Sequence, residues 1–219
     1  VRRDRRTRYR AVTDEDYEIL ARSTPGLRVA RAKAIPLYPL EPQAIPKNGG
    51  ESAANETFLP RVTVIVVPYS LSSRPTPSRG FLKTVCRHLE QHRLITTQLF
   101  VIGPEYTEIT VESEIVIKPG VDPAAARSQI KEALDRFLDP LKGGTDEGGW
   151  PFGRTVYRSE IYQAIENVQG VDCVNQVALT AQGGSSARNK GDITISKIAL
   201  VYPGDHNLDI TTADQVHRL

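Results

Sequence analysis

The chain has 219 residues, of which 39% are apolar and 25% are charged, a composition ordinary for a globular protein with one large or two small domains. No apolar run is long enough to cross a bilayer, so we expect no membrane span. The beginning is rich in arginine without an apolar stretch behind it, so we expect no signal peptide. Cys86 and Cys173 lie far apart and outside any CxxC pattern, which predicts buried free thiols and synthesis in a reducing cytoplasm.

Charge is distributed unevenly along the chain. The first ten residues hold six arginines and one acid, and without them the net charge changes from +2 to −3. Such an arm, residues 1–12, can bind nucleic acid, pair with an acidic surface of a neighbouring subunit, or stay solvated. The body has no basic stripe or helix-turn-helix, so we expect no nucleic-acid partner. The arginines that we assign to a subunit interface are Arg2, Arg3, Arg5, Arg6, Arg8 and Arg10.

Residues 13–105 predict a first α+β domain. Thr13 and Asp16 form a capping-box pattern at the start of a helix over 13–23, and Pro25-Gly26 ends it. The proline-rich segment 36–60 predicts an exposed loop, whose role stays open. The other expected elements are strands over 27–35, 62–67 and 98–102 and a helix over 78–92, with the apolar strand 62–67 covered on both faces.

Residues 106–205 predict a second α+β domain, and residues 206–219 a C-terminal tail. Apolar and polar side chains alternate over 106–117, which indicates a strand with one solvated face. Asp122-Pro123 is a helix start, and an apolar stripe follows it to Leu141. The remaining expected elements are a glycine-rich loop over 143–153, a helix over 159–168, a strand over 171–179, a Gly/Ser loop over 182–192 and a strand over 193–202.

The element order predicts an α+β protein of two consecutive ferredoxin-like halves with short, mainly antiparallel sheets, dividing near residue 105. Each expected helix presents one apolar face to a sheet. We expect Leu89, Leu134 and Leu138 to lie in the cores.

The sequence shows no phosphate-binding loop, nucleophile elbow or dinucleotide fingerprint. His88 and His92 have the spacing of a zinc pair on a helix, but Glu90 does not follow the first histidine and Cys86 falls on the other side. We expect no metal there. Glu112 and Glu114 suit either a general acid/base pair or a solvated strand face, and we expect the solvated face. We therefore expect no catalytic residues and no cofactor.

Trp150 lies in the glycine-rich loop with Phe152 two residues behind it. An aromatic side chain in such a loop either plugs the core of its own domain or anchors a partner. Both interpretations stay open, and we include Trp150 and Phe152 among the candidate interface residues.

Three blocks together resemble baseplate J-like proteins, the wedge components of contractile phage tails and related injection particles. They are residues 8–34 around Pro25-Gly26, residues 64–92, and Gly149-Trp150-Pro151-Phe152-Gly153-Arg154 with Ser159-Glu160-Ile161-Tyr162 and Gly170-Val171 behind it. The resemblance runs from about residue 6 to 203. Members of the family are often longer, which agrees with a chain that begins at Val1, has no methionine and is expected to be a piece of something larger.

The resemblance implies a mechanical protein, not an enzyme. Its implied partners are other copies of itself and other wedge and hub proteins, with sheath and tube-proximal proteins as further candidates. Together they form a ring around the central spike and tube and relay the trigger for contraction. The implied location is the assembled tail or particle, after synthesis in the bacterial cytoplasm.

Two rival functions stay open at this point. Ferredoxin-like pairs often bind small molecules between their halves, so the chain could be a small-molecule-binding regulatory module, and a copurifying ligand would favour it. An enzyme with a site shared between chains is the other rival. Its mark would be an activity lost when scattered acidic residues are replaced.

Overall fold

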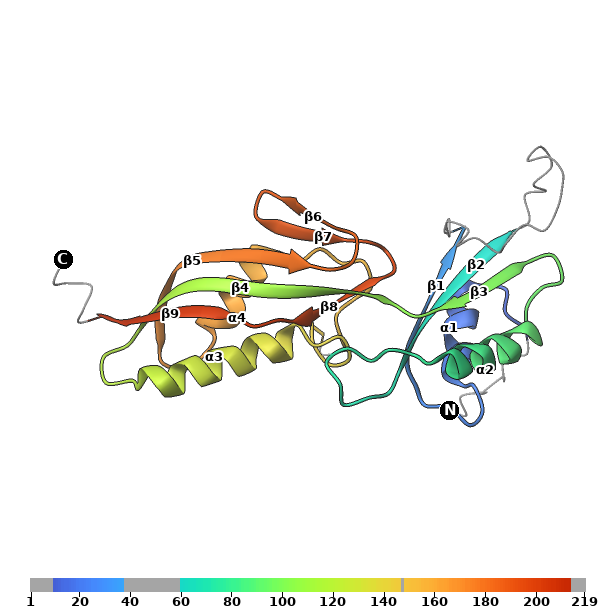
Figure 1. Cartoon of the computed structure of the whole chain (residues 1–219), viewed down its shortest axis with the longest axis horizontal. Coiled ribbons are helices and arrows are strands. Elements are labelled where there is room, and N and C mark those ends of the chain that lie inside the picture. The colour runs from blue at the N-terminus through green and yellow to red at the C-terminus, as the bar shows by residue number, and fades with distance from the viewer. Residues whose placement is uncertain (1–9, 38–59, 147, 214–219) are drawn as a thin grey trace, which may run out of the picture. The chain divides into compact units, whose positions relative to one another are not determined.

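The computed structural model describes residues 10–37, 60–146 and 148–213. The chain divides into two compact units, of which unit 1 comprises Val1–Ser70 and Pro75–Gly103, and unit 2 comprises Leu71–Arg74 and Pro104–Leu219. The main boundary therefore lies close to the division expected near residue 105. Both units combine helices with small, mainly antiparallel sheets, so the predicted α+β class is confirmed (Figure 1). No helix in the described part is long and apolar enough to cross a membrane.

Unit 1 has the α-β-β-α-β order that the sequence predicts. Its elements are α1 (Asp14–Arg22), β1 (Val29–Pro36), β2 (Arg61–Pro68), α2 (Arg79–Glu90) and β3 (Gln98–Ile102). The central strand β2 pairs antiparallel with β1 and parallel with β3. The capping box of Thr13 and Asp16 is present at the start of α1, and the Ser78 side chain caps α2.

The core of unit 1 lies between its two helices and its sheet. Val64 and Val66 of β2 are fully buried against a cluster that includes Tyr17 of α1 and Leu89 of α2. Thr63, Ile65 and Val67, which alternate with them, are also fully buried. The continuous apolar run of this strand therefore reflects burial on both faces.

Unit 2 is organised around one long strand. Its elements are β4 (Glu105–Ile117), α3 (Pro123–Phe137), α4 (Arg158–Glu166), β5 (Val171–Gln182), β6 (Ser186–Asn189), β7 (Asp192–Ile195), β8 (Ala199–Pro203) and β9 (Asn207–Thr212). β4 pairs antiparallel with β5 along one side (Figure 1). Along its other side it pairs parallel first with β8 and then with β9.

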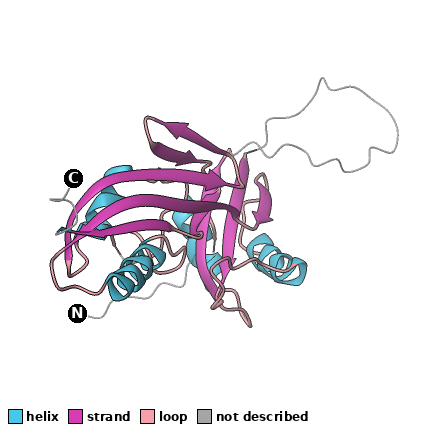
Figure 2. Ribbon diagram, turned by 60° about the vertical axis from the view of Figure 1, so that its left-hand side comes forward, coloured by secondary structure: helices cyan, strands magenta, loops and turns pink. Residues whose placement is uncertain are grey.

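Three expectations for the second half are wrong. The segment 206–219 was expected to be a tail, but its residues Asn207–Thr212 form β9, which pairs parallel with the second half of β4. The strand expected over 193–202 is broken into β7 and β8, because a turn closes where the Ala199 amide donates to the Ser196 carbonyl. The loop expected over 182–192 contains β6, which forms a hairpin with β7 that Figure 2 shows apart from the larger sheet.

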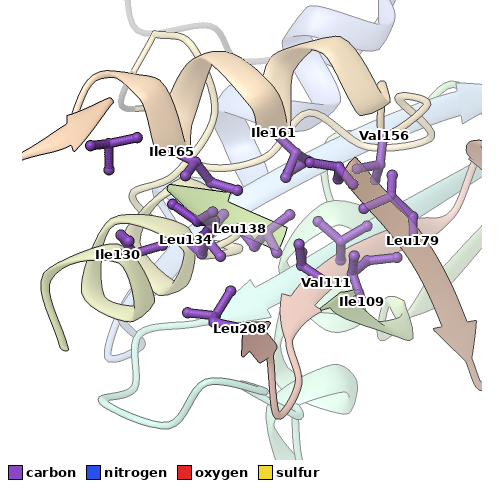
Figure 3. Packing of buried hydrophobic residues seen from close by; sticks show 14 of the residues in the cluster. Ile109, Val111, Ile130, Leu134, Leu138, Val156, Ile161, Ile165, Leu179 and Leu208 are labelled. Carbon is purple, nitrogen blue, oxygen red and sulfur yellow. The ribbon is translucent and has the colours of Figure 1, made fainter. Parts of the chain in front are cut away.

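Apolar side chains of α3, α4 and the sheet form the core of unit 2. Figure 3 shows Leu134 and Leu138 from the α3 segment and Ile161 and Ile165 of α4 pointing toward the side chains of the sheet. Leu89, Leu134 and Leu138 each have 0% of their surface exposed. The predicted core positions of all three leucines are therefore confirmed.

We expect Leu134→Ala to lower the free energy of unfolding by about 2–5 kcal/mol, because it removes buried methyl groups and leaves a cavity between α3 and the sheet. Urea denaturation followed by circular dichroism measures the change. Gln129→Ala, an exposed position on the same helix, is the matched control and is expected to change the value by less than about 0.5 kcal/mol. Equal effects of the two substitutions would contradict this packing.

Candidate functional site

Trp150 closes the core of unit 2 from the glycine-rich loop. Its side chain is 0% exposed, and its indole Nε1 donates to the Arg154 carbonyl at 3.2 Å. The Phe137 ring meets it edge to face, with 5.5 Å between the centroids. The Arg154 guanidinium lies 5.4 Å from the centre of the indole ring and pairs with Glu160 of α4.

The glycines around Trp150 allow this loop to fold. Gly144, Gly149 and Gly153 have backbone φ angles of 80°, 88° and 67°, a region that residues other than glycine rarely adopt. A Cβ on Gly153 would also come within 2.8 Å of the Lys197 Cα. The loop therefore seats the indole in the protein's own core.

The burial of Trp150 decides between its two interpretations. A side chain with no exposed surface cannot insert into a partner in this conformation, so the structure supports the core plug and not the partner anchor. Phe152 is half-buried and keeps some surface for a contact. Of the arginine arm, only Arg10 lies within the described residues, where it is exposed, and Arg2, Arg3, Arg5, Arg6 and Arg8 lie outside them.

His88 and His92 lie together on α2 and at its end. Their ring centroids are 4.8 Å apart. Burial lowers the pKa of His88, and the neighbouring His92 lowers it further, so the neutral form is favoured. Within the described residues, no group of three or more His, Cys, Asp and Glu side chains has the arrangement of a metal site.

His206 has a role that sequence reasoning missed, because the residue was assigned to a tail. It lies between the last residue of β8 and the first residue of β9. Its Nδ1 accepts a hydrogen bond from the Val111 amide of β4 at 3.1 Å. The imidazole therefore accepts a hydrogen bond from the backbone of β4 at the point where β8 ends and β9 has not yet begun.

The protonation state of His206 follows from its contacts. Because Nδ1 accepts, the proton of the neutral ring is on Nε2, which lies 3.4 Å from the Asp135 Oδ1 of α3. Burial lowers the pKa of His206, and nearby Lys131 lowers it further. The carboxylates of Asp135 and Asp205 act in the opposite direction but do not outweigh burial. The folded protein therefore holds this side chain neutral.

The face of the unit 2 sheet turned away from the core is acidic. Residues of β4 alternate, so that Val111 and Ile115 lie in the core while Glu112 and Glu114 are exposed. Asp209 of β9 lies opposite Glu114. A shallow groove with a volume of about 250 Å³ runs over this face. Its lining consists of Glu112, Ser113, Glu114, Gln176, Ala178, Asn207 and Asp209.

The acidic face agrees with the solvated strand face that the alternation predicts. None of the groove's residues is basic. Within the described part of the chain, no ion pair reaches Glu112, Glu114 or Asp209. We call these three residues the acidic face.

No protein-family model matches the chain, and no curated protein matches it. Solved structures do match, and one of them is a chain in the cryo-EM structure of the anti-feeding prophage baseplate, six-fold symmetrised. The likeness has a TM-score of 0.62 and 18% sequence identity. It covers 90% of this chain and only 38% of the other, so this chain spans well under half the length of the protein it matches. At this identity the likeness shows a shared fold.

We expect acid to destabilise the protein through His206. Its pKa in the unfolded chain is near the ordinary 6.5, while burial lowers it in the folded protein. Near pH 6 the unfolded chain therefore binds more protons. The free energy of unfolding is then highest above about pH 6.5 and falls as the pH falls further, by at most about 1.4 kcal/mol per pH unit for one proton.

His206→Asn tests this expectation, because an amide oxygen can accept from the Val111 amide without titrating. Urea unfolding of both proteins from pH 8 to pH 5 is expected to give a flatter profile for the variant. The contribution of His88 is present in both proteins and cancels in the difference. Parallel profiles would contradict the assignment.

Proposed function

We propose that this chain is a structural component of the baseplate of a contractile phage tail or a related injection particle. In this role it joins a ring of wedge proteins around the central spike and tube. It works by holding its neighbours and relaying the trigger for contraction, without catalysing a reaction. The particle, in this proposal, is where the protein resides.

The observation that carries the proposal is the extent of the likeness to the anti-feeding prophage baseplate chain. It covers 90% of this chain and so includes most of both units. A single α+β unit of this size recurs in many unrelated proteins, and a fold alone does not specify a function. Two different units joined in one order are a more specific pattern, and the three blocks of sequence that resemble baseplate J-like proteins also suggest a baseplate component.

Exposed apolar side chains of unit 1 add support. Leu94 and Ile95, which follow α2, are 37% and 96% exposed, and Phe100 of β3 is 38% exposed. Leu94 and Ile95 are adjacent in the sequence, and an apolar patch left in contact with water is typical of surfaces that a partner covers. A protein that works by holding neighbours requires such surfaces.

Deletion of the gene in cells that produce the particle is the direct test. We expect assembled sheath-and-tube particles to disappear from electron micrographs, because an incomplete baseplate ring cannot start the sheath. Expression of the chain from a plasmid is expected to restore them, with the protein detected by mass spectrometry in purified particles. Normal particles in the deletion strain would overturn the proposal.

A double substitution tests whether the exposed apolar side chains of unit 1 contact a neighbouring protein. Leu94→Ser with Ile95→Ser removes two exposed apolar side chains without opening a core, and we expect less of this variant in particles than of the wild type. The control is Tyr157→Ser, which removes an apolar surface of unit 2 that is 44% exposed. Equal incorporation of both variants into particles would exclude the unit 1 surface as a contact. The proposed baseplate role would then still depend on the result of the gene deletion.

A further inference from the structure

The acidic face of unit 2 carries three carboxylates that no ion pair among the described residues reaches. α3 and α4 both pack on the opposite face of the sheet, in the core cluster with Val111 and Ile115. Glu112 and Glu114 are two residues apart on β4, and Asp209 lies directly across from Glu114 on β9. Neighbouring strands are about 4.8 Å apart, so this pair brings two like charges close together.

Like charges directly opposite each other on a sheet are destabilising. Two other acids of unit 2 are paired with bases, Glu132 with Arg136 and Glu160 with Arg154. Glu112, Glu114 and Asp209 have no such partner in the described part, and no basic side chain lines their groove. A cationic segment laid on this face would remove the repulsion.

We propose that the arginine-rich residues 1–10 of a neighbouring copy of this chain dock on the acidic face. The proposal rests on the ring assembly proposed above. Each chain has one arm and one acidic face, so docking is head to tail. Contacts of this kind generate a closed ring when the rotation between copies closes.

The chemistry of the arm fits the face. Six of its ten residues are arginines, whose planar guanidinium groups bind carboxylates through two parallel hydrogen bonds. Side chains two residues apart on an extended strand repeat at about 6.8 Å, which is the spacing of Glu112 and Glu114. Arg6, Arg8 and Arg10 have the same two-residue spacing in the sequence.

The arm also has a defined starting point. The Ala11 amide donates to the His92 carbonyl at 2.8 Å, and Ala11 is fully buried in unit 1. Ten residues preceding this point can reach at most about 35 Å. This reach is enough to extend beyond a domain of this size to the surface of an adjoining copy.

Sedimentation of the 219-residue chain at low and high salt tests the docking. We expect the wild type to self-associate at low ionic strength and to separate at about 0.5 M salt, because exposed charge pairs are screened. The face variant Glu112→Gln, Glu114→Gln, Asp209→Asn is expected to associate on the order of tenfold or more weakly at low salt. Its melting temperature is expected to equal or exceed that of the wild type, since a repulsion is removed.

The matched control is Glu132→Gln, Asp146→Asn, Glu166→Gln. It changes the net charge by the same amount at exposed positions of unit 2 outside the acidic face, and we expect it to associate like the wild type. If net charge alone governed self-association, the face variant and the control variant would associate equally weakly. That outcome would overturn the proposal.

Mixing two variants shows whether the docking joins separate chains. The arm variant replaces Arg2, Arg3, Arg5, Arg6, Arg8 and Arg10 with serine and keeps its acidic face. Alone, the arm variant and the face variant are each expected to associate more weakly than the wild type. Mixed, they are expected to form one-to-one complexes that grow no further. The arm of the face variant then occupies the face of the arm variant.

Three further results would overturn the docking: a wild type that stays monomeric at low salt, a face variant that associates like the wild type, or a mixture that forms no complex. These results concern the arm alone. If the gene deletion leaves particles intact, the proposed function fails whatever the mixing experiment shows. If the deletion removes particles and the mixture forms no complex, only the docking fails.

Discussion

Unit 2 depends on the pairing of one strand. β4 has 13 residues, and β5, β8 and β9 all pair with it and not with one another. Its alternation divides the unit into a core face, with Ile109 and Val111, and an acidic face, with Glu112 and Glu114. A shift by one residue in its register would bury the carboxylates and expose the core, so the same alternation specifies both the packing and the charged surface.

His206 shows how the side of β4 that faces both β8 and β9 keeps its backbone hydrogen-bonded between these two strands. The pairing of β8 ends opposite Ile109, and that of β9 begins opposite Glu112. Val111 lies in the gap, and its amide would be buried without a backbone acceptor, which is costly. The His206 ring, which lies in the segment between β8 and β9, accepts the hydrogen bond of this amide. The continuity of the sheet thus depends on a side chain, and on that side chain remaining neutral.

The sequence predicts the first unit and the helices well, because their signals are local. The caps at Thr13 and Asp122 and the apolar stripe through Leu134 depend only on nearby residues. β9 was missed although Leu208 and Ile210 alternate with polar residues, because a short strand at a chain end has no turn signal behind it. The role of His206 could not be predicted, since it depends on a pairing between segments about a hundred residues apart.

The residues of the candidate site could also be predicted only in part from the sequence. Glu112 and Glu114 could be placed on one solvated face from their spacing, but Asp209 comes from β9 and joins them only through the fold. Trp150 belongs to one of the three blocks that carry the family resemblance, and its side chain closes the core of unit 2. This residue of the family resemblance therefore maintains the fold. Contacts with neighbours are left to surface positions without a motif, which is why a resemblance can predict an architecture and still not identify the residues that hold an assembly together.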